Sequence, residues 1–280
     1  MTRVLITGAN GFLANYLANL FSDSNSYLVG LARSMNMELD EKYDCIYTDV
    51  DTLLTNEIKF DFVFHLASYI PSETSNESNK EFIETNIELT SRLVMAYWSS
   101  RFVFASSISV YGVPQLSTLT VDSYFNKPGL YGLSKLAGEA IVFNHPDHAI
   151  IRFSSIIGKH MKGHTFIPKI LDQARSGTIT LWGDGSRKQN YIDVRDAAKL
   201  MVKCSLFKGN TLTLGVGIRS YSNAEVAQLV AKKNNSQIKY QGVDASPSFI
   251  YDAEDSYKKL AFYPEFTLEQ SISHMMNQSQ

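Results

Sequence analysis

Short runs of apolar residues alternate with segments of helical periodicity along the first half of the chain, and this alternation restricts the fold more than any other feature of the sequence. The runs at 4–6, 27–31, 62–66, 102–105 and 149–151 are typical of strands that are buried on both faces. Segments between them, such as 81–96 and 131–143, carry apolar residues at helical spacing. Strands that alternate with helices predict a parallel sheet covered by helices on both faces.

A glycine turn follows the first predicted strand. The stretch TGANGFLA places Gly8 and Gly11 before a helix that begins near Phe12, with Ala14 at the third small position. Residues without a Cβ let backbone N–H groups approach a phosphate, and the helix N-terminus adds partial positive charge. The same spacing also fits a plain turn that only joins a strand to a helix. Its place at the first strand–helix turn of the chain favours a dinucleotide site.

The end of the second predicted strand, in VGLARS, bears on the choice of dinucleotide. An acidic residue at this place would bind the ribose 2′-hydroxyl of NAD, but here Ala32 occupies it and Arg33 follows. An arginine suits a 2′-phosphate, which favours NADP, with NAD as the alternative. As a solvated loop residue, Arg33 would carry no such preference. Asp49 could accept a hydrogen bond from the adenine amino group, although surface aspartates are common.

The composition excludes several classes of protein. The chain has 280 residues, of which 44% are apolar and 19% charged, and its formal net charge of −2 does not suggest a nucleic-acid partner. Its two cysteines, Cys45 and Cys204, lie far apart and without metal-ligand spacing, which favours a reducing compartment. The N-terminal apolar run is too short for a signal peptide, and no apolar stretch approaches the roughly 20 residues that span a bilayer. We therefore expect a soluble, cytoplasmic protein with no membrane partner.

The segment YGLSK places Tyr131 and Lys135 one helical turn apart, so both side chains lie on the same face of the predicted helix. Taken alone, such a pair is more often ordinary helix surface. Further motifs stand in order along the chain: TGANGFLA, HLAS, ETNIELTSRLVMA, FASSISVYG, IRFSSIIG and LWGDGSRKQNYIDVRDAA. With them the chain resembles the extended short-chain dehydrogenase/reductase family, and within it the NAD(P)-dependent sugar-nucleotide epimerases, dehydratases and reductases. The resemblance covers nearly the whole chain.

The alternation of strands and helices changes after about residue 157, which indicates two parts in one α/β fold. Residues 1–157 are expected to form a dinucleotide-binding domain with a Rossmann-type, doubly wound parallel sheet, to which the chain returns at about 190–216. Residues 158–280 are expected to form a smaller C-terminal α/β domain that binds the substrate. There the sequence predicts a helix over 166–175, a strand and glycine turn in TITLWGDGSR, a helix capped by Asp193, and a helix opened by a capping box at Ser222 to Glu225.

The resemblance implies a catalytic role for three residues. Ser107 would polarise a carbonyl, Tyr131 would act as the general acid, and Lys135 would lower the pKa of the phenol and hold the nicotinamide ribose. Asn86 would support them from the neighbouring helix, or serve only in packing or capping. The expected cofactor contacts are Gly8, Gly11, Phe12, Leu13, Arg33, Asp49, Val50, Leu66, Ala67, Asn86, Tyr131 and Lys135.

The expected substrate contacts are Ser68, Ser107, Ser155, Pro168, Trp182, Arg187 and Gln189. Two of these positions depart from the family pattern, which usually has an asparagine at Ser155 and an arginine at Gln189. Arg187 or Lys188 would then take the place of that arginine. For Trp182, packing in the core is an equally good interpretation. His160 and His164 fall in a predicted loop, and no metal site is expected.

The residues that follow Ser107 limit the reaction. The family's 4,6-dehydratases have an acidic pair there, whereas this chain has Ile108 and Ser109, which argues against a dehydratase. Arg33 and the compact length favour an NADPH-dependent reductase of a 4-keto-6-deoxy sugar nucleotide, with an NAD(P)-dependent sugar-nucleotide epimerase as the alternative. A more remote alternative is a non-catalytic NADP-sensing regulator, against which the intact catalytic residues argue. Family members are often dimers, so a homodimer is among the expected assemblies.

Overall fold

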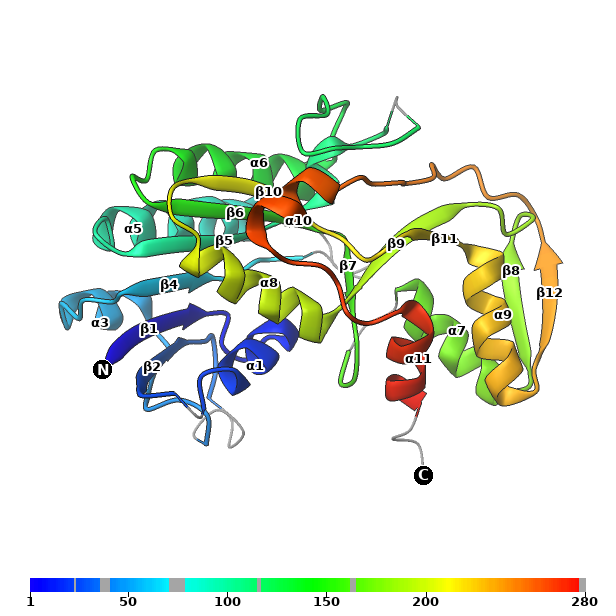
Figure 1. Ribbon diagram of the computed structural model, residues 1–280, viewed down its shortest axis with the longest axis horizontal. Helices are drawn as coiled ribbons and strands as arrows, with labels where there is room; N and C mark the ends of the chain where they lie inside the picture. The colour runs from blue at the N-terminus through cyan, green and yellow to red at the C-terminus, as the bar shows by residue number, and fades with distance from the viewer. Residues whose placement is uncertain (23, 36–40, 71–78, 115–116, 162–164, 277–280) are drawn as a thin grey trace.

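The central element of the structure is a seven-stranded sheet in the order β10-β6-β5-β4-β1-β2-β3, in which each pair of neighbouring strands is parallel (Figure 1). The computed structural model describes residues 1–22, 24–35, 41–70, 79–114, 117–161 and 165–276. The sheet confirms the predicted Rossmann-type fold. Its strands are β1 (Thr2–Thr7), β2 (Ser26–Leu31), β3 (Cys45–Tyr47), β4 (Phe62–His65), β5 (Arg101–Ser107), β6 (His148–Phe153) and β10 (Thr211–Gly215).

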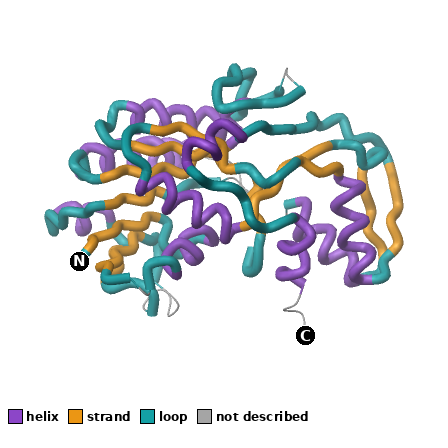
Figure 2. The backbone as a smooth tube through the Cα atoms, viewed as in Figure 1, coloured by secondary structure: helices purple, strands orange, loops and turns teal. Residues whose placement is uncertain are grey.

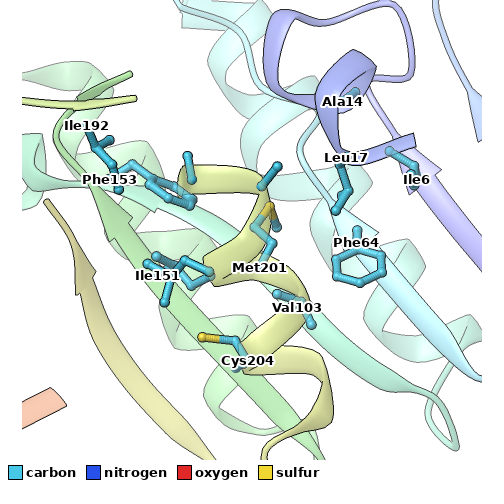
Figure 3. Packing of buried hydrophobic residues seen from close by; sticks show 14 of the residues in the cluster. Ile6, Ala14, Leu17, Phe64, Val103, Ile151, Phe153, Ile192, Met201 and Cys204 are labelled. Carbon is cyan, nitrogen blue, oxygen red and sulfur yellow. The ribbon is translucent and has the colours of Figure 1, made fainter. Parts of the chain in front are cut away.

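Helices cover both faces of this sheet. One face carries α1 (Phe12–Asn19) and α8 (Val194–Leu206), and the other carries α5 (Leu89–Ala96) and α6 (Leu130–Phe143). Strands in the middle of the sheet are therefore buried on both sides, and all six residues of β6 are buried. Figure 3 shows the apolar cluster on the first face, which joins α1 and α8 to the sheet.

The direction of winding reverses between β1 and β4. From β1 the chain adds β2 and β3 on one side, and from β4 it adds β5, β6 and β10 on the other. The last residues of the two central strands, Thr7 and His65, lie opposite each other in the register. In an open parallel sheet, the crevice at the carboxyl ends of such a strand pair is where ligands bind.

One predicted helix has a different internal structure. The spacing predicts a continuous helix over 81–96, whereas the chain forms α4 (Asn79–Glu81), the π-helical segment η1 (Phe82–Glu88) and then α5. A π-helix is wider than an α-helix and is frequent at functional sites. Apolar periodicity gave no signal for it, because the widening affects only two turns.

The rest of the chain forms a smaller part on the side of the molecule away from the N-terminus (Figure 2). It contains a three-stranded sheet and a two-stranded parallel sheet, with a separate apolar cluster. The predicted capping box at Ser222 and Glu225 and the predicted cap at Asp193 are both confirmed. The elements are β7 (Ser155–Ile157), α7 (Phe166–Arg175), β8 (Thr178–Trp182), β9 (Lys188–Asp193), β11 (Ser220–Ser222), α9 (Asn223–Asn234), β12 (Gln237–Gln241) and α11 (Leu268–Met276), with α10 (Glu254–Leu260) against β10. Within the described ranges, no helix combines the length and the apolar character that crossing a membrane requires.

Candidate active site

The glycine turn lies directly at the crevice between β1 and β4. Gly8 has a φ of +67°, and a Cβ there would lie 2.9 Å from the backbone N of Ala67. The N–H of Gly11 bonds to the backbone O of Gly8 at 2.7 Å, and Gly11 precedes α1 without a side-chain cap. The turn therefore brings bare backbone and a helix N-terminus to the crevice, which is the arrangement that suits a diphosphate.

A cavity of about 1070 Å³ extends from this turn along the carboxyl ends of the strands. It brings together most of the residues that the sequence nominated for the cofactor and for catalysis, and its size and polar edges fit a dinucleotide. The nominated residues in its wall are Gly8, Gly11, Phe12, Leu13, Arg33, Asp49, Val50, Leu66, Ala67, Ser68, Ser107, Tyr131, Lys135 and Ser155. Residues of η1 and α5 that the sequence did not single out, Glu84, Glu88 and Arg92, line it as well.

Tyr131 meets two hydroxyl groups in this wall. Burial raises the pKa of the phenol, and hydrogen bonds with the Ser68 and Ser107 side chains act in the opposite direction. Ser107 ends β5, and its Oγ accepts from the backbone N–H of Ser109 at 3.2 Å. In this arrangement burial dominates the pKa of Tyr131, and the two serine hydroxyls oppose it. The expected effect of Lys135 on the phenol stays a prediction.

Lys135 is buried one turn further along α6. Its Nζ lies 4.4 Å from the centre of the Phe104 ring, in a cation–π contact. Burial lowers the pKa of Lys135 to about 7, and the charge of Glu139 acts in the opposite direction. Its ammonium group thus gains and loses a proton near neutral pH.

Asn86 lies behind the cavity wall and holds it together. Its Oδ1 accepts from the backbone N–H of Tyr69 at 2.7 Å and from Ser68 Oγ at 3.1 Å. Its Nδ2 donates to the backbone O of Tyr69 at 3.1 Å and to Ser134 Oγ at 2.9 Å. Asn86 is 2% exposed, so these bonds form away from water. They tie the segment after β4 to α6, and they set the position of the serine that contacts Tyr131.

The segment that follows β4 is also held by a buried threonine. Thr7 Oγ1 accepts from the backbone N–H groups of Leu66 at 3.2 Å and Ala67 at 3.1 Å. With both acceptor positions occupied, its own proton points to His65 Nδ1 at 2.7 Å. His65 Nδ1 is therefore an acceptor, and the ring proton must lie on Nε2.

His65 Nε2 donates to Thr90 Oγ1 at 2.8 Å, and Thr90 Oγ1 donates to the backbone O of Asn86 at 2.9 Å. Burial and, to a smaller extent, the charge of the nearby Lys135 lower the pKa of His65 to about 3. The histidine is thus a neutral link between the ends of β1 and β4 and the helix that carries Asn86.

At the other end of the cavity, Asp49, expected to accept a hydrogen bond from the adenine amino group, is the N-cap of a helix. Its Oδ2 accepts from Thr52 N at 2.8 Å and from Thr52 Oγ1 at 2.9 Å, so it caps α3 (Val50–Thr55). Arg33 is exposed and lines the cavity there. Arg92 also lines it and forms an ion pair with Asp51.

A second cavity of about 520 Å³ adjoins the first at Ser109, Tyr131 and Ser155. Gln189 lines it and donates to Asn223 Oδ1 at 2.8 Å. Three nominated substrate residues, Pro168, Trp182 and Arg187, do not line either of these two cavities. The Trp182 side chain is 61% exposed and lies next to Gly242, where a Cβ would be 2.5 Å from the indole. Arg187 Nε donates to the backbone O of Pro247 at 3.2 Å.

Among the residues that the structure describes, no three His, Cys, Asp or Glu side chains are grouped so that they could hold a metal ion. His160 lies in the loop after β7 with a φ of +68°. His164, the second histidine that the sequence placed in this loop, is outside the described residues.

Comparison with known proteins gives a consistent picture. Residues 4–210 match the family model described as the NAD dependent epimerase/dehydratase family. UDP-glucose 4-epimerase of Lactobacillus helveticus is 26% identical, over 85% of this chain and 83% of the relative. The crystal structure of UDP-glucuronic acid 4-epimerase from Bacillus cereus in complex with NAD has a TM-score of 0.84 at 20% identity and covers 99% of this chain and 96% of its own. The UDP-N-acetylglucosamine 4-epimerase of Methanobrevibacter ruminantium M1 gives a TM-score of 0.87 at 19% identity, over 99% and 97% of the two chains.

Proposed function

Because the chain belongs to the NAD dependent epimerase/dehydratase family, we propose that it is a sugar-nucleotide 4-epimerase that uses NAD and regenerates it in each cycle. Membership also confirms the enzyme class that the sequence motifs predicted. The observation that carries the proposal is the placement of the Tyr131 phenol, with the hydroxyls of Ser68 and Ser107, in the same cavity as the glycine turn.

The relatives favour an epimerase over the reductase that the sequence favoured. The curated relative and the solved neighbours described above are named as 4-epimerases of UDP-sugars. The reductase prediction rested mainly on Arg33, a residue at the cofactor end of the cavity that takes no part in the chemistry of the sugar. Ile108 and Ser109 supply no carboxyl group for the elimination that a dehydratase performs.

In a 4-epimerisation, the C4 hydroxyl of the sugar loses its proton and C4 loses a hydride, which leaves a ketone. The ketone then turns its opposite face to the hydride donor, and the hydride and the proton return. NAD, held by the Gly8–Gly11 backbone, Leu66 and Ala67, would supply the hydride chemistry. Tyr131 moves the proton at its phenol oxygen. Because burial raises the pKa of Tyr131, the phenol holds its proton at neutral pH and is ready to donate it to a carbonyl oxygen.

The reverse transfer, from the sugar hydroxyl to Tyr131, needs positive charge near the phenolate. Lys135 supplies this charge in its protonated form from one turn away. Ser107 would hold the sugar oxygen and stabilise the negative charge that develops on it.

NAD is the proposed dinucleotide, and NADP is the competitor that Arg33 favours. The B. cereus neighbour was solved with NAD. Titration of the protein and of Arg33→Ala with both dinucleotides separates the two. We expect tighter binding of NAD and little change in its affinity in the variant. A tighter NADP complex that weakens about tenfold or more in Arg33→Ala, a loss of about 1.4 kcal/mol, would reverse the choice.

For the substrate, we propose that residues 158–280 bind the sugar nucleotide together with Ser155, and that Ser155 and Gln189 contact it at the second cavity. Pro168, Trp182 and Arg187 remain proposed contacts for the nucleotide portion. Alanine at Gln189 should raise KM for the sugar nucleotide more than it lowers kcat, because this residue contacts Asn223 and not the reacting groups.

The decisive experiment incubates the protein with UDP-glucose, UDP-N-acetylglucosamine and UDP-glucuronic acid and substoichiometric NAD, and detects the C4 epimers by NMR. We expect many turnovers per NAD without net oxidation. Tyr131→Phe should lose turnover and still bind NAD, whereas Tyr124→Phe, which changes a tyrosine that is 89% exposed, should behave as the unchanged protein. Consumption of one NADPH per product from a 4-keto sugar nucleotide would instead establish the reductase.

A homodimer is the assembly that the surface of α5 and α6 favours. The two helices pack side by side and expose Met95, Leu133 and Phe143, whose exposed fractions are 74%, 51% and 48%. Exposed apolar groups of this kind often mark an association surface. Light scattering after size exclusion should give twice the chain mass, and Phe143→Ser should shift it toward the monomer. A monomeric unchanged protein contradicts the proposal.

A further inference from the structure

The helix that carries Tyr131 and Lys135 has a third ionisable residue on the same face. Glu139 lies one turn beyond Lys135 on α6, and it is 2% exposed. The proposed reaction gives this carboxyl group no role. Carboxylates are seldom buried to this degree without a partner, so the groups around Glu139 indicate what it does.

Three donors fix the Glu139 side chain. Arg152 on β6 donates from Nε to Oε1 at 3.0 Å and from its NH2 group to Oε2 at 2.8 Å. Ser106 Oγ donates to Oε1 at 2.5 Å, which joins the end of β5, next to Ser107, to the middle of α6. Donors reach both oxygens, and the ion pair with Arg152 at 2.8 Å holds the carboxyl group in one place.

The groups that face Lys135 come from several elements. From β4 comes His65, which burial keeps neutral, and from β5 comes the uncharged ring of Phe104. Tyr131 and Glu139 belong to the same helix as Lys135. Glu139 is the group whose charge favours the protonated lysine, against the larger and opposite effect of burial.

We propose that Glu139 is a positioning residue for Lys135: its carboxylate, fixed by Arg152 and Ser106, keeps the lysine protonated in the pH range in which Tyr131 transfers its proton. The electrostatic part of this inference concerns Lys135 alone. Its catalytic consequence rests on the proposed function.

The two members of the ion pair should act on Lys135 in opposite directions. In Glu139→Gln the negative charge is gone and the Arg152 guanidinium stays behind unpaired, so Lys135 should lose its proton at lower pH. In Arg152→Met the guanidinium charge is gone while Glu139 stays, and Lys135 becomes the cation with which this carboxyl group can pair, so Lys135 should keep its proton to higher pH. If the pair only fastened α6 to β6, both variants would break the same contact and neither would move the lysine in a direction set by charge.

The test follows the ¹³Cε chemical shift of Lys135 from pH 5.5 to 10, assigned by its absence in Lys135→Met. We expect the titration midpoint to fall by about one pH unit or more in Glu139→Gln and to rise by a similar amount in Arg152→Met. Ser106→Ala, which removes one hydrogen bond and no charge, is the matched control and should move it far less. The proposal is overturned if the Lys135 midpoint shifts in the same direction in Glu139→Gln and Arg152→Met, or if neither variant differs from the unchanged protein.

The activity measurement comes second and separates the two proposals. If the protein is an epimerase, the pH profile of kcat should move in the same opposite directions as the Lys135 midpoint. Opposite shifts of the midpoint without any turnover would uphold the role of Glu139 and reject the proposed function. If Glu139→Gln does not fold, Glu139→Asp replaces it, because the shorter side chain moves the carboxyl group away from Lys135. We then expect the Lys135 midpoint to fall by less than one pH unit. An unchanged midpoint in Glu139→Asp would count against the proposal.

Discussion

A single methyl group at Gly132 tests whether the geometry between α6 and the end of β5 sets the rate. A Cβ on this residue would lie 2.3 Å from the backbone O of Ser109, whereas ordinary contact begins at about 3.4 Å. In Gly132→Ala the start of α6 and the segment after Ser107 must therefore move apart by about 1 Å, the difference between these two distances. Such overpacking costs about 1–3 kcal/mol of unfolding free energy. A displacement of this size between Tyr131 and Ser107 lowers turnover by about 100-fold.

Gly129, three residues earlier, provides the control. A Cβ there meets nothing within 4 Å, and its φ of −67° suits any residue. Gly129→Ala should cost at most about 1 kcal/mol, through its place as the N-cap of α6. Both variants are compared by urea unfolding, by NAD affinity and by kcat with the best sugar nucleotide. If Gly132→Ala matches Gly129→Ala in stability and in kcat, the contact with Ser109 does not fix the catalytic geometry and the reasoning fails.

Three further predictions concern the buried polar groups. Asn86→Ala removes four hydrogen bonds and should lower the unfolding free energy, measured by urea titration, by about 2–4 kcal/mol. Asn56 is exposed and its side chain makes one hydrogen bond, so Asn56→Ala should change the same quantity by less than about 1 kcal/mol. The pKa of His65 is about 3 in the folded protein and 6.5 in the unfolded chain, so only the unfolded chain binds a proton between these values. As the pH falls from 6.5 toward 3, the unfolding free energy of the unchanged protein should therefore decrease by up to about 1.4 kcal/mol per pH unit more than that of His65→Gln. Equal slopes in the two proteins would contradict the assignment. The pKa of Lys135 is about 7 in the folded protein and 10.5 in the unfolded chain, so the unfolded chain binds one more proton between these pH values. The unfolding free energy should therefore rise as the pH increases from 7 to 10.5. Unfolding of Lys135→Met, measured at several pH values, should lack this rise.

Local chemistry explains what could be predicted from the sequence. A glycine turn after a buried strand, a serine followed three residues later by a glutamate, and a tyrosine and lysine four residues apart are all short-range patterns. Each is fixed by backbone geometry within a few residues, and the structure contains the turn, the capping box at Ser222 and the shared helix face. The order of strands and helices was sufficient for the parallel sheet, because crossovers between parallel strands obey few rules.

The partners of the site residues could not be predicted in the same way. Asn86 was nominated, but its contacts with Ser68, Tyr69 and Ser134 reach across 17 to 48 residues and depend on a π-helical segment that apolar spacing does not signal. Glu139 continues the four-residue spacing of the tyrosine and lysine, and this spacing could have found it. Its significance, however, comes from Arg152 on a neighbouring strand.

The sequence by itself determined the class of fold, the phosphate-binding turn and the helix face that carries Tyr131 and Lys135, since these follow from contacts between neighbours along the chain. Only the tertiary structure decided how strongly those groups hold their protons. Burial disfavours a charge through all the atoms packed around it, and these atoms come from strands and helices that are far apart in the sequence. This is why only the fold could determine the raised pKa of Tyr131, the lowered pKa of Lys135 and the neutral state of His65.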